Sequence, residues 1–287
     1  MTVLVRKPAE LRQACDDARA LGHRVGLVPT MGALHEGHFS LIEEAKARAG
    51  FIVATIFVNP LQFAAGEDLE RYPRMLESDL DGCQARGVDL VFAPERDAMY
   101  PPGFQTSVVV SRLSRPLEGE FRPTHFEGVT TVVAKLFNLV GPSVAVFGRK
   151  DYQQWKVLST MVRDLHMPVE VVGCPIVRET DGLALSSRNR YLSIAERERA
   201  LAIVAALREA HDAWERGERR GERLRALATE RVERDVDRID YVAAIDPESL
   251  LPAPESPTPS RLLIAVAAHL GGTRLIDNVV LGEDPRP

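Results

Sequence analysis

The chain is predicted to be an α/β protein, with a Rossmann-like doubly wound parallel sheet followed by a smaller C-terminal α+β domain. Short apolar runs alternate with helix-like stretches over residues 1–176, as in a sheet built from right-handed crossovers. These runs are almost continuously apolar, which is typical of parallel strands buried on both faces. Residues 177–287 instead contain two long charged helices and three closing strands. A length of 287 residues suits two domains, predicted at 1–176 and 177–287.

The first domain is predicted to contain six strands rich in Val, Ile and Phe, with helices between them. The strands are expected at residues 24–28, 51–58, 88–92, 106–110, 143–147 and 169–177. The helices are expected at residues 40–49, 68–86, 129–139 and 152–165. Because Pro73 cannot lie inside a regular helix, the second of these must begin after it or be broken there. In such sheets, ligands bind beyond the carboxyl ends of the strands.

The second domain is predicted from a different pattern. A polar loop at 178–189 precedes a helix at 193–217, where Ser193 and Glu196 have the spacing of a capping box. A second charged helix is expected at 221–236, and strands at 239–245, 262–267 and 274–281. Residues 252–260 contain several prolines and are predicted to form a connecting loop.

Composition excludes several classes of protein. The net charge is −5 and the basic residues are scattered, whereas nucleic-acid-binding proteins normally carry a basic stripe. No run of about 18 apolar residues could span a membrane, and the N-terminus lacks the apolar stretch of a signal peptide. We therefore expect a cytoplasmic protein that binds neither nucleic acid nor membrane. The three cysteines are too widely spaced for a zinc site and are expected to be buried, reduced thiols.

The most informative segment is residues 29–38, between the first strand and the first long helix. Gly32 and Gly37 allow a tight turn and a close approach of the backbone to a ligand. The helix that follows directs its free amides and positive dipole end at an anion. His35 and His38 share one face if the helix includes both. We interpret the segment as a phosphate-binding turn; loop histidines beside an ordinary glycine turn, and a zinc pair without further ligands, are the competing interpretations.

A second polar cluster, residues 147–154, also lies between a strand and a helix. Lys150 could neutralise phosphate charge, and Asp151 could cap the helix or help to hold Mg²⁺. A plain helix cap with solvated charges remains the alternative.

A third cluster, residues 185–189, offers two serine hydroxyls and the guanidinium of Arg188. The planar fork of donors on Arg188 suits a phosphate group. An exposed polar linker is the alternative for this cluster.

Six segments, in order along the chain, resemble the pantothenate synthetase (pantoate–β-alanine ligase) family. They are residues 29–38, 57–63, 72–74, 124–129, 150–154 and 181–189. The His-x-Gly-His sequence at 35–38 is the signature of the nucleotidyl-transferase superfamily to which that family belongs. The resemblance implies an ATP-dependent condensation of pantoate with β-alanine through a pantoyl-adenylate, which yields pantothenate, AMP and pyrophosphate. It also implies Mg²⁺, a homodimer and a C-terminal domain that closes over the active site.

The resemblance further implies roles for individual residues. His38 takes the role of proton donor, Gln62 and Gln154 bind pantoate, and Gln62 also binds β-alanine. The ATP site comprises Met31, Gly32, Ala33, Leu34, His35, Glu36, Gly37, His38, Gly148, Arg149, Lys150, Asp151, Val177, Leu185, Ser186, Ser187 and Arg188. The ligands of Mg²⁺ are not identified by this comparison. Arg149 and Leu185 depart from the family pattern, where Glu or Gln and Met are usual.

Two other functions remain open from the residues alone. A nucleotidylyltransferase has a similar His-x-Gly-His turn, but its phosphorylated substrate should demand additional cations, whereas Gln62 and Gln154 suit a neutral polyol-like acid. A non-catalytic nucleotide-binding module would need the glycine turn but not Lys150 together with the loop 185–189.

Overall fold

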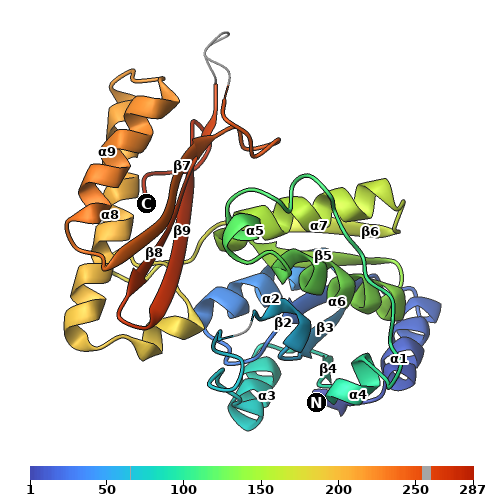
Figure 1. Ribbon diagram of the computed structural model, residues 1–287. Helices are drawn as coiled ribbons and strands as arrows, with labels where there is room; N and C mark the ends of the chain where they lie inside the picture. The colour runs from blue at the N-terminus through green and yellow to red at the C-terminus, as the bar shows by residue number, and fades with distance from the viewer. Residues whose placement is uncertain (65, 254–259) are drawn as a thin grey trace. The chain divides into compact units, whose positions relative to one another are not determined.

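The computed structural model describes residues 1–64, 66–253 and 260–287 (Figure 1). The chain divides into two compact units. The first unit comprises Met1–Arg149 and Gln154–Pro175, and the second comprises Lys150–Gln153 and Ile176–Pro287.

The first unit is built on one six-stranded parallel sheet, which confirms the predicted doubly wound α/β fold. The strand order is β1-β4-β3-β2-β5-β6. From β2, the strands β3, β4 and β1 extend the sheet in one direction, and β5 and β6 extend it in the other. The switch point therefore lies between β2 and β5. The strands are β1 (Val3–Val5), β2 (Val25–Thr30), β3 (Phe51–Ile56), β4 (Leu90–Phe92), β5 (Ser143–Gly148) and β6 (Val169–Cys174).

Helices cover both faces of this sheet, because alternate strand residues point into two separate cores. Leu27 and Phe147 belong to one core, together with side chains of α1, α6 and α7. Val28 and Val146 belong to the other core, together with side chains of α2 and α3. The helical segments are α1 (Pro8–Ala20), α2 (Glu36–Arg48), η1 (Pro60–Gln62), α3 (Leu76–Ala85), α4 (Arg96–Met99), α5 (Glu118–Phe121), α6 (His125–Val140), η2 (Arg149–Asp151) and α7 (Tyr152–Asp164).

The prediction of a strand at residues 106–110 is wrong, because these residues form no regular secondary structure. The backbone N–H of Val108 donates to Thr131 Oγ1 at 3.0 Å, and the Val108 carbonyl accepts from Thr130 Oγ1 at 2.5 Å. Two threonines of α6 thus satisfy the backbone groups that a strand ladder would otherwise use. Conversely, β1 and α1 were not among the predicted elements.

Prolines account for two differences between the predicted and observed boundaries of elements. The helix predicted at 68–86 begins only at Leu76, after Pro73, as Pro73 required. The strand predicted at 169–177 ends at Cys174, immediately before Pro175. The three cysteines are buried and free, as expected. Along the described part of the chain, no helix is both long and apolar enough to span a bilayer.

The second unit has the predicted α+β character. Its antiparallel sheet has the order β7-β8-β9, and Leu207, Trp214 and Leu224 of its two long helices share a core with Ile264 and Val279 of the sheet. The elements are α8 (Ile194–Glu215), α9 (Gly221–Glu233), β7 (Arg238–Ile245), β8 (Leu262–Leu270) and β9 (Thr273–Leu281). Most of the proline-rich loop predicted at 252–260 lies outside the described residues.

The predicted capping box at the start of α8 is present. Ser193 Oγ accepts from the Glu196 amide at 3.3 Å, and the Glu196 carboxylate accepts from the Ser193 amide at 2.8 Å. These reciprocal bonds satisfy two amides that helix geometry leaves without partners.

Candidate active site

The His-x-Gly-His turn leaves the carboxyl end of β2 and leads into α2. Gly32 and Ala33 both have left-handed backbone conformations, with φ of 85° and 52°. Gly32 is required both for this conformation and for space, because a Cβ there would lie 2.9 Å from a carboxylate oxygen of Asp79. These two residues form the turn that leads to His35, the N-cap of α2.

The hydrogen bonds of the two imidazoles define their tautomers. His35 Nδ1 accepts from the Gly37 amide at 3.1 Å and so caps α2, while His38 Nδ1 accepts from the His35 amide at 3.4 Å. Because each Nδ1 is an acceptor, a neutral ring carries its proton on Nε2. The rings lie 4.1 Å apart between centroids. Both can therefore present an Nε2–H donor to an anion beside the N-terminus of α2.

Asp79 holds the turn in place and was not among the residues predicted for the site. It lies on α3, and its carboxylate accepts from the amides of Ala33 at 2.9 Å and Leu34 at 2.8 Å. Its exposed fraction is 3 %. The available signal was a carboxylate at position 79 between Leu76 and Cys83, on the apolar face of a predicted helix.

The side chain of Gln62 is held by its neighbours in the first unit. Its Oε1 accepts from Asn59 Nδ2 at 3.0 Å, and its Nε2 lies 2.9 Å from the sulfur of Met31. Asn59 Oδ1 in turn accepts from the Tyr100 hydroxyl at 2.8 Å. The structure thus brings two predicted site residues, Gln62 and Met31, together. Asn59 was also missed, although it lies inside the segment 57–63.

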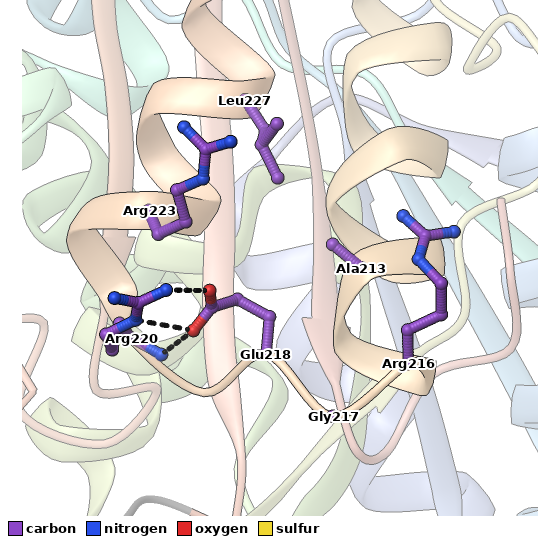
Figure 2. A pocket seen from close by; sticks show the side chains of 7 residues that line it. All are labelled: Ala213, Arg216, Gly217, Glu218, Arg220, Arg223 and Leu227. Carbon is purple, nitrogen blue, oxygen red and sulfur yellow. Dashed lines mark hydrogen bonds and ion pairs between the residues drawn. The ribbon is translucent and has the colours of Figure 1, made fainter.

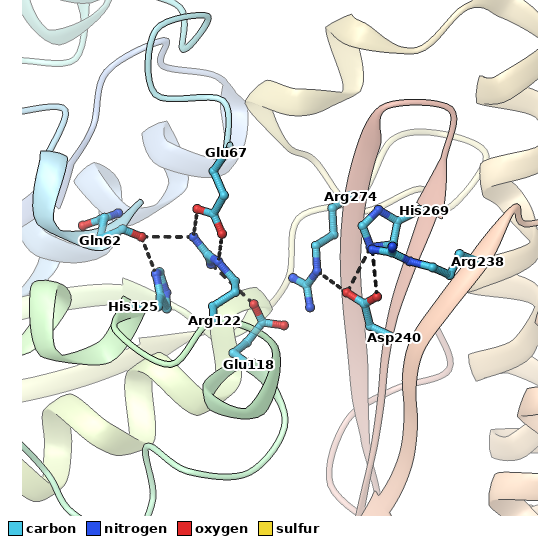
Figure 3. A network of polar contacts seen from close by, with 9 residues as sticks. All are labelled: Gln62, Glu67, Glu118, Arg122, His125, Arg238, Asp240, His269 and Arg274. Atoms are coloured by element: carbon cyan, nitrogen blue, oxygen red, sulfur yellow. Dashed lines mark hydrogen bonds and ion pairs between the residues drawn. The ribbon is translucent and has the colours of Figure 1, made fainter. Parts of the chain in front are cut away.

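The backbone of Gln62 is anchored by a second set of contacts (Figure 3). Its carbonyl accepts from His125 Nδ1 at 2.9 Å and from the Arg122 guanidinium at 3.1 Å. Arg122 also pairs with both oxygens of Glu67 at 2.6 and 2.8 Å. Burial lowers the pKa of His125 to about 4, and the charge of Arg122 adds to this effect. His125 is therefore a neutral donor at neutral pH.

Glycine at position 128 allows α6 to approach η1 closely. A Cβ on Gly128 would lie 2.3 Å from the Leu61 carbonyl oxygen and 2.6 Å from the Gln62 nitrogen. Any larger residue would therefore displace the backbone that carries Gln62.

The predicted cluster around Lys150 follows the end of β5, as expected for a strand-end site. Lys150 is half-buried and Asp151 is exposed. The Lys150 carbonyl accepts from Asn278 Nδ2 at 2.8 Å, within the second unit. Gln154 begins the part of α7 that belongs to the first unit and is half-buried.

The loop with the two serines forms an ordered substructure of the second unit. The Leu185 amide donates to the Val177 carbonyl at 3.0 Å, which brings these two predicted residues together. Ser186 Oγ accepts from the Arg188 amide at 3.3 Å and begins η3 (Ser187–Tyr191). Asn189 Nδ2 braces the loop through the Ala184 carbonyl at 3.0 Å. The hydroxyls and guanidinium of this segment are thus presented from one compact turn.

The predicted site residues therefore fall into two sets. Residues 31–38, 62, 148, 149 and 154 belong to the first unit, whereas 150, 151, 177 and 185–188 belong to the second. Within the ranges that the structure describes, no group of three or more His, Cys, Asp and Glu side chains could hold a metal ion.

Each unit also has a cavity. The cavity of about 430 Å³ in the first unit borders Met31, Gly32 and Asp79. The cavity of about 410 Å³ in the second unit contains none of the predicted residues; it lies beside the start of α9, where Arg220 pairs with Glu218 at 2.6 Å (Figure 2).

Comparison with known proteins identifies the family. The sequence model of the pantoate-beta-alanine ligases matches residues 3–280. The chain belongs to the pantoate–β-alanine ligase family. Pantothenate synthetase of Anaeromyxobacter dehalogenans (strain 2CP-C) is 54 % identical over 96 % of this chain and 97 % of that protein. Pantothenate synthetase of Geotalea uraniireducens (strain Rf4) is 51 % identical over 98 % and 99 %.

Solved structures of this family share the fold. Pantothenate synthetase from Thermus thermophilus superposes with a TM-score of 0.90 at 47 % identity, covering 96 % of this chain and 98 % of that chain. The pantoate-beta-alanine ligase from Francisella tularensis, complexed with beta-gamma ATP and beta-alanine, gives a TM-score of 0.81 at 30 % identity and full coverage of both chains. The chain is therefore an enzyme, a ligase that joins pantoate to β-alanine with ATP.

Proposed function

We propose that the enzyme forms pantothenate in two steps, through a pantoyl-adenylate bound in the predicted site. In the first step the pantoate carboxylate attacks the α-phosphorus of ATP, and the bond to pyrophosphate breaks. In the second step the β-alanine amine attacks the acyl carbon, AMP leaves and the amine loses a proton. No covalent bond to the protein is required, so catalysis rests on positioning and electrostatic stabilisation.

The observation that carries this proposal is the pair of Nδ1 hydrogen bonds at His35 and His38. With Nδ1 as the acceptor in each ring, a neutral imidazole carries its proton on Nε2, and both rings lie at the N-terminus of α2, where an anion is favoured. His38 is assigned the proton-donor role toward the leaving pyrophosphate. Lys150, Ser186, Ser187 and Arg188 are assigned to the remaining phosphate charge.

Pantoate is assigned to Gln62 and Gln154, and β-alanine to Gln62. A neutral amide can donate to the carboxylate or hydroxyls of pantoate without reducing the nucleophilicity of the carboxylate as a cation would. The Gln62 amide is oriented by Asn59 and Met31 before any substrate binds, which reduces the entropy lost on binding.

Mg²⁺ is proposed as the ion that accompanies ATP. Protein sites for Mg²⁺–nucleotide complexes commonly supply one or two carboxylates, with phosphates and waters as the other ligands. The exposed carboxylate of Asp151, beside Lys150, fits this requirement. When bound, Mg²⁺ supplies positive charge to the phosphates.

The proposal extends to assembly and location on the strength of the sequence resemblance. It comprises a cytoplasmic homodimer in which residues 1–176 bind ATP and pantoate and residues 177–287 close over the active site. Analytical ultracentrifugation of the pure protein tests the dimer, and a single monomeric species at working concentration would contradict it.

Exchange of labelled pyrophosphate into ATP tests the chemistry. With pantoate, Mg²⁺ and ATP but no β-alanine, exchange should occur, and addition of β-alanine should give pantothenate and AMP. His38→Ala and Lys150→Ala should each slow exchange by about 10²–10³-fold, the usual effect of one lost transition-state donor. His23→Ala, in the loop before β2, and Lys46→Ala, at the far end of α2, are at exposed positions and are the matched controls. Formation of ADP, or exchange that requires β-alanine, would contradict the two-step scheme.

A further inference from the structure

Three consecutive backbone amides at the end of β2 are directed to side chains of the protein itself. The Gly32 amide donates to Thr30 Oγ1 at 3.1 Å. The amides of Ala33 and Leu34 donate to the two carboxylate oxygens of Asp79 at 2.9 and 2.8 Å. The backbone amides of the glycine turn therefore donate to side chains of the protein itself.

The backbone conformation of this turn would otherwise form an anion site. The amides of Ala33 and Leu34 are successive and donate to the same group, and successive N–H groups in a turn can form a concave site that binds anions. Asp79 occupies that position. A Cβ on Gly32 would lie 2.9 Å from Asp79 Oδ2, so the carboxylate packs directly against the turn.

Asp79 is buried, so its carboxylate depends on these hydrogen bonds. Asp79 is 3 % exposed, and an ionised carboxylate away from water requires strong hydrogen-bond donors. Two amides from one turn provide them in a bidentate arrangement. The partners are 46 and 45 residues apart in the sequence, so the contact fixes α3 against the end of β2.

We propose that Asp79 is a positioning residue, an internal anion that fills the nest formed by the Ala33 and Leu34 amides and sets the placement of His35 and His38. With the nest filled, nucleotide phosphate is directed to the N-terminus of α2, where His35 and His38 lie, and is excluded from the glycine turn. This inference rests on the proposed ATP site and adds a residue that does not touch the substrate.

Replacement of Asp79 by Asn tests the bidentate contact at nearly constant shape. An amide has one oxygen, so its NH₂ group must face one of the two backbone N–H donors. We expect the turn to shift and kcat/KM for ATP to fall by about 10- to 100-fold, as small misplacements of catalytic groups do. KM for pantoate should change much less. Wild-type pyrophosphate exchange in Asp79→Asn would overturn the inference.

Asp89 provides a matched control in the same unit. Its carboxylate also accepts from a backbone amide, that of Ile52 at 2.7 Å, but it does not contact the His-x-Gly-His turn. Asp89→Asn should lower the melting temperature without lowering the exchange rate measured well below that temperature. An equal loss of exchange in the two variants would reduce the role of Asp79 to general stability.

Chemical rescue distinguishes an anion in the nest from a merely structural side chain. The cavity of about 430 Å³ borders both Gly32 and Asp79, so a small carboxylate can reach the turn. In Asp79→Ala, formate should restore exchange several-fold, whereas chloride at equal ionic strength should not. No rescue by formate in a folded Asp79→Ala would overturn the nest assignment.

Amide hydrogen exchange of the wild-type enzyme keeps the inference testable if the variants do not fold. The Ala33 and Leu34 amides should be protected without nucleotide, and a non-hydrolysable ATP analogue should shift them less than the amides of residues 35–38. Fast exchange, or the largest shift at Ala33 and Leu34, would overturn it. His38→Ala separates the two proposals, because retained exchange in that variant contradicts the ATP site itself, whereas an effect at His38 alone contradicts only the role of Asp79.

Discussion

Two polar networks of similar composition, one in each unit, differ in what surrounds the charges (Figure 3). The Gln62 network consists of Gln62, Glu67, Glu118, Arg122 and His125. Its one guanidinium is 14 % exposed and faces two carboxylates and a backbone carbonyl. Its histidine faces that same carbonyl and is kept neutral by burial.

The Asp240 network, in the second unit, has the opposite arrangement. One carboxylate, 5 % exposed, lies 3.0 Å from His269 Nε2 and accepts from Arg274 Nε at 2.7 Å. Arg238, 67 % exposed, lies 3.3 Å from it. Burial would raise the pKa of Asp240, but hydrogen bonds from Arg274 and His269 lower it below its ordinary value. A buried cation with several acceptors and a buried anion with several donors thus respond differently to mutation, acid and salt.

The largest expected difference comes from removing the guanidinium at the centre of the Gln62 network. Arg122→Met leaves the carboxylates of Glu67 and Glu118, 23 % and 9 % exposed, without their cation. The loss of a buried partner typically costs about 3–5 kcal/mol in the free energy of unfolding. KM for pantoate should also rise, because the Gln62 carbonyl loses a donor. Urea unfolding measures the first effect and steady-state kinetics the second.

Arg238→Met in the Asp240 network is the control for that experiment. Its guanidinium is largely exposed, so its loss should cost less than about 1 kcal/mol. Equal losses of stability in the two variants would show that burial does not distinguish the networks.

The second-largest expected effect is a loss of folding stability in acid, caused by His125 of the Gln62 network. The folded pKa of His125 is about 4, below the value of about 6.5 for an unfolded histidine. The unfolded chain therefore binds the proton first, and stability falls as the pH drops below about 6.5, until the folded state also protonates. At pH 5 the loss from this group is about 2 kcal/mol relative to pH 7.

His125→Asn removes this titration while keeping an N–H donor toward the Gln62 carbonyl. The difference in unfolding free energy between wild type and variant should therefore shrink as the pH is lowered from 7 to 5. A difference that does not change with pH would show that His125 titrates normally in the folded protein.

Features of the fold that depend on nearby residues were predictable from the sequence, whereas features that depend on distant residues were not. The capping box of Ser193 and Glu196 was predictable because its partners are three residues apart, and the parallel sheet because its strands are individually apolar. Residues 106–110 have the composition of a strand, but their backbone partners are threonines in α6, more than 20 residues away. Composition alone does not show whether the backbone of such a segment pairs with a strand or with side chains of a helix.

The candidate site shows the same division. The segments that resemble the family supplied the residues expected to touch the substrates. The residues that hold them, such as Asp79 and Arg122, lie 45 to 60 residues from their partners. Hydrogen bonding at that separation depends on the fold, so these supporting residues became visible only in the structure.

Salt should produce the smallest difference between the networks, and a pair of double-mutant cycles can isolate it. One cycle combines Glu67→Gln with Arg122→Met, and the other combines Asp240→Asn with Arg274→Met. The chain has two tryptophans, Trp155 in the first unit and Trp214 in the second. Trp214→Phe and Trp155→Phe backgrounds therefore let fluorescence follow the unfolding of each unit separately.

The expected salt effect follows from the exposure of the cations. The Debye length falls from about 10 Å at 0.1 M salt to about 3 Å at 1 M, and salt screens exposed charges more than buried ones. Asp240 faces the largely exposed guanidinium of Arg238 and that of Arg274, which is 20 % exposed, so its coupling energy with Arg274 should fall by about 0.5 kcal/mol between these concentrations. The coupling between Glu67 and Arg122 should change less, because Arg122 is 14 % exposed. A larger salt effect on the Glu67–Arg122 pair would mean that water reaches the Gln62 network in solution, and the pKa of His125 would then lie nearer its ordinary value.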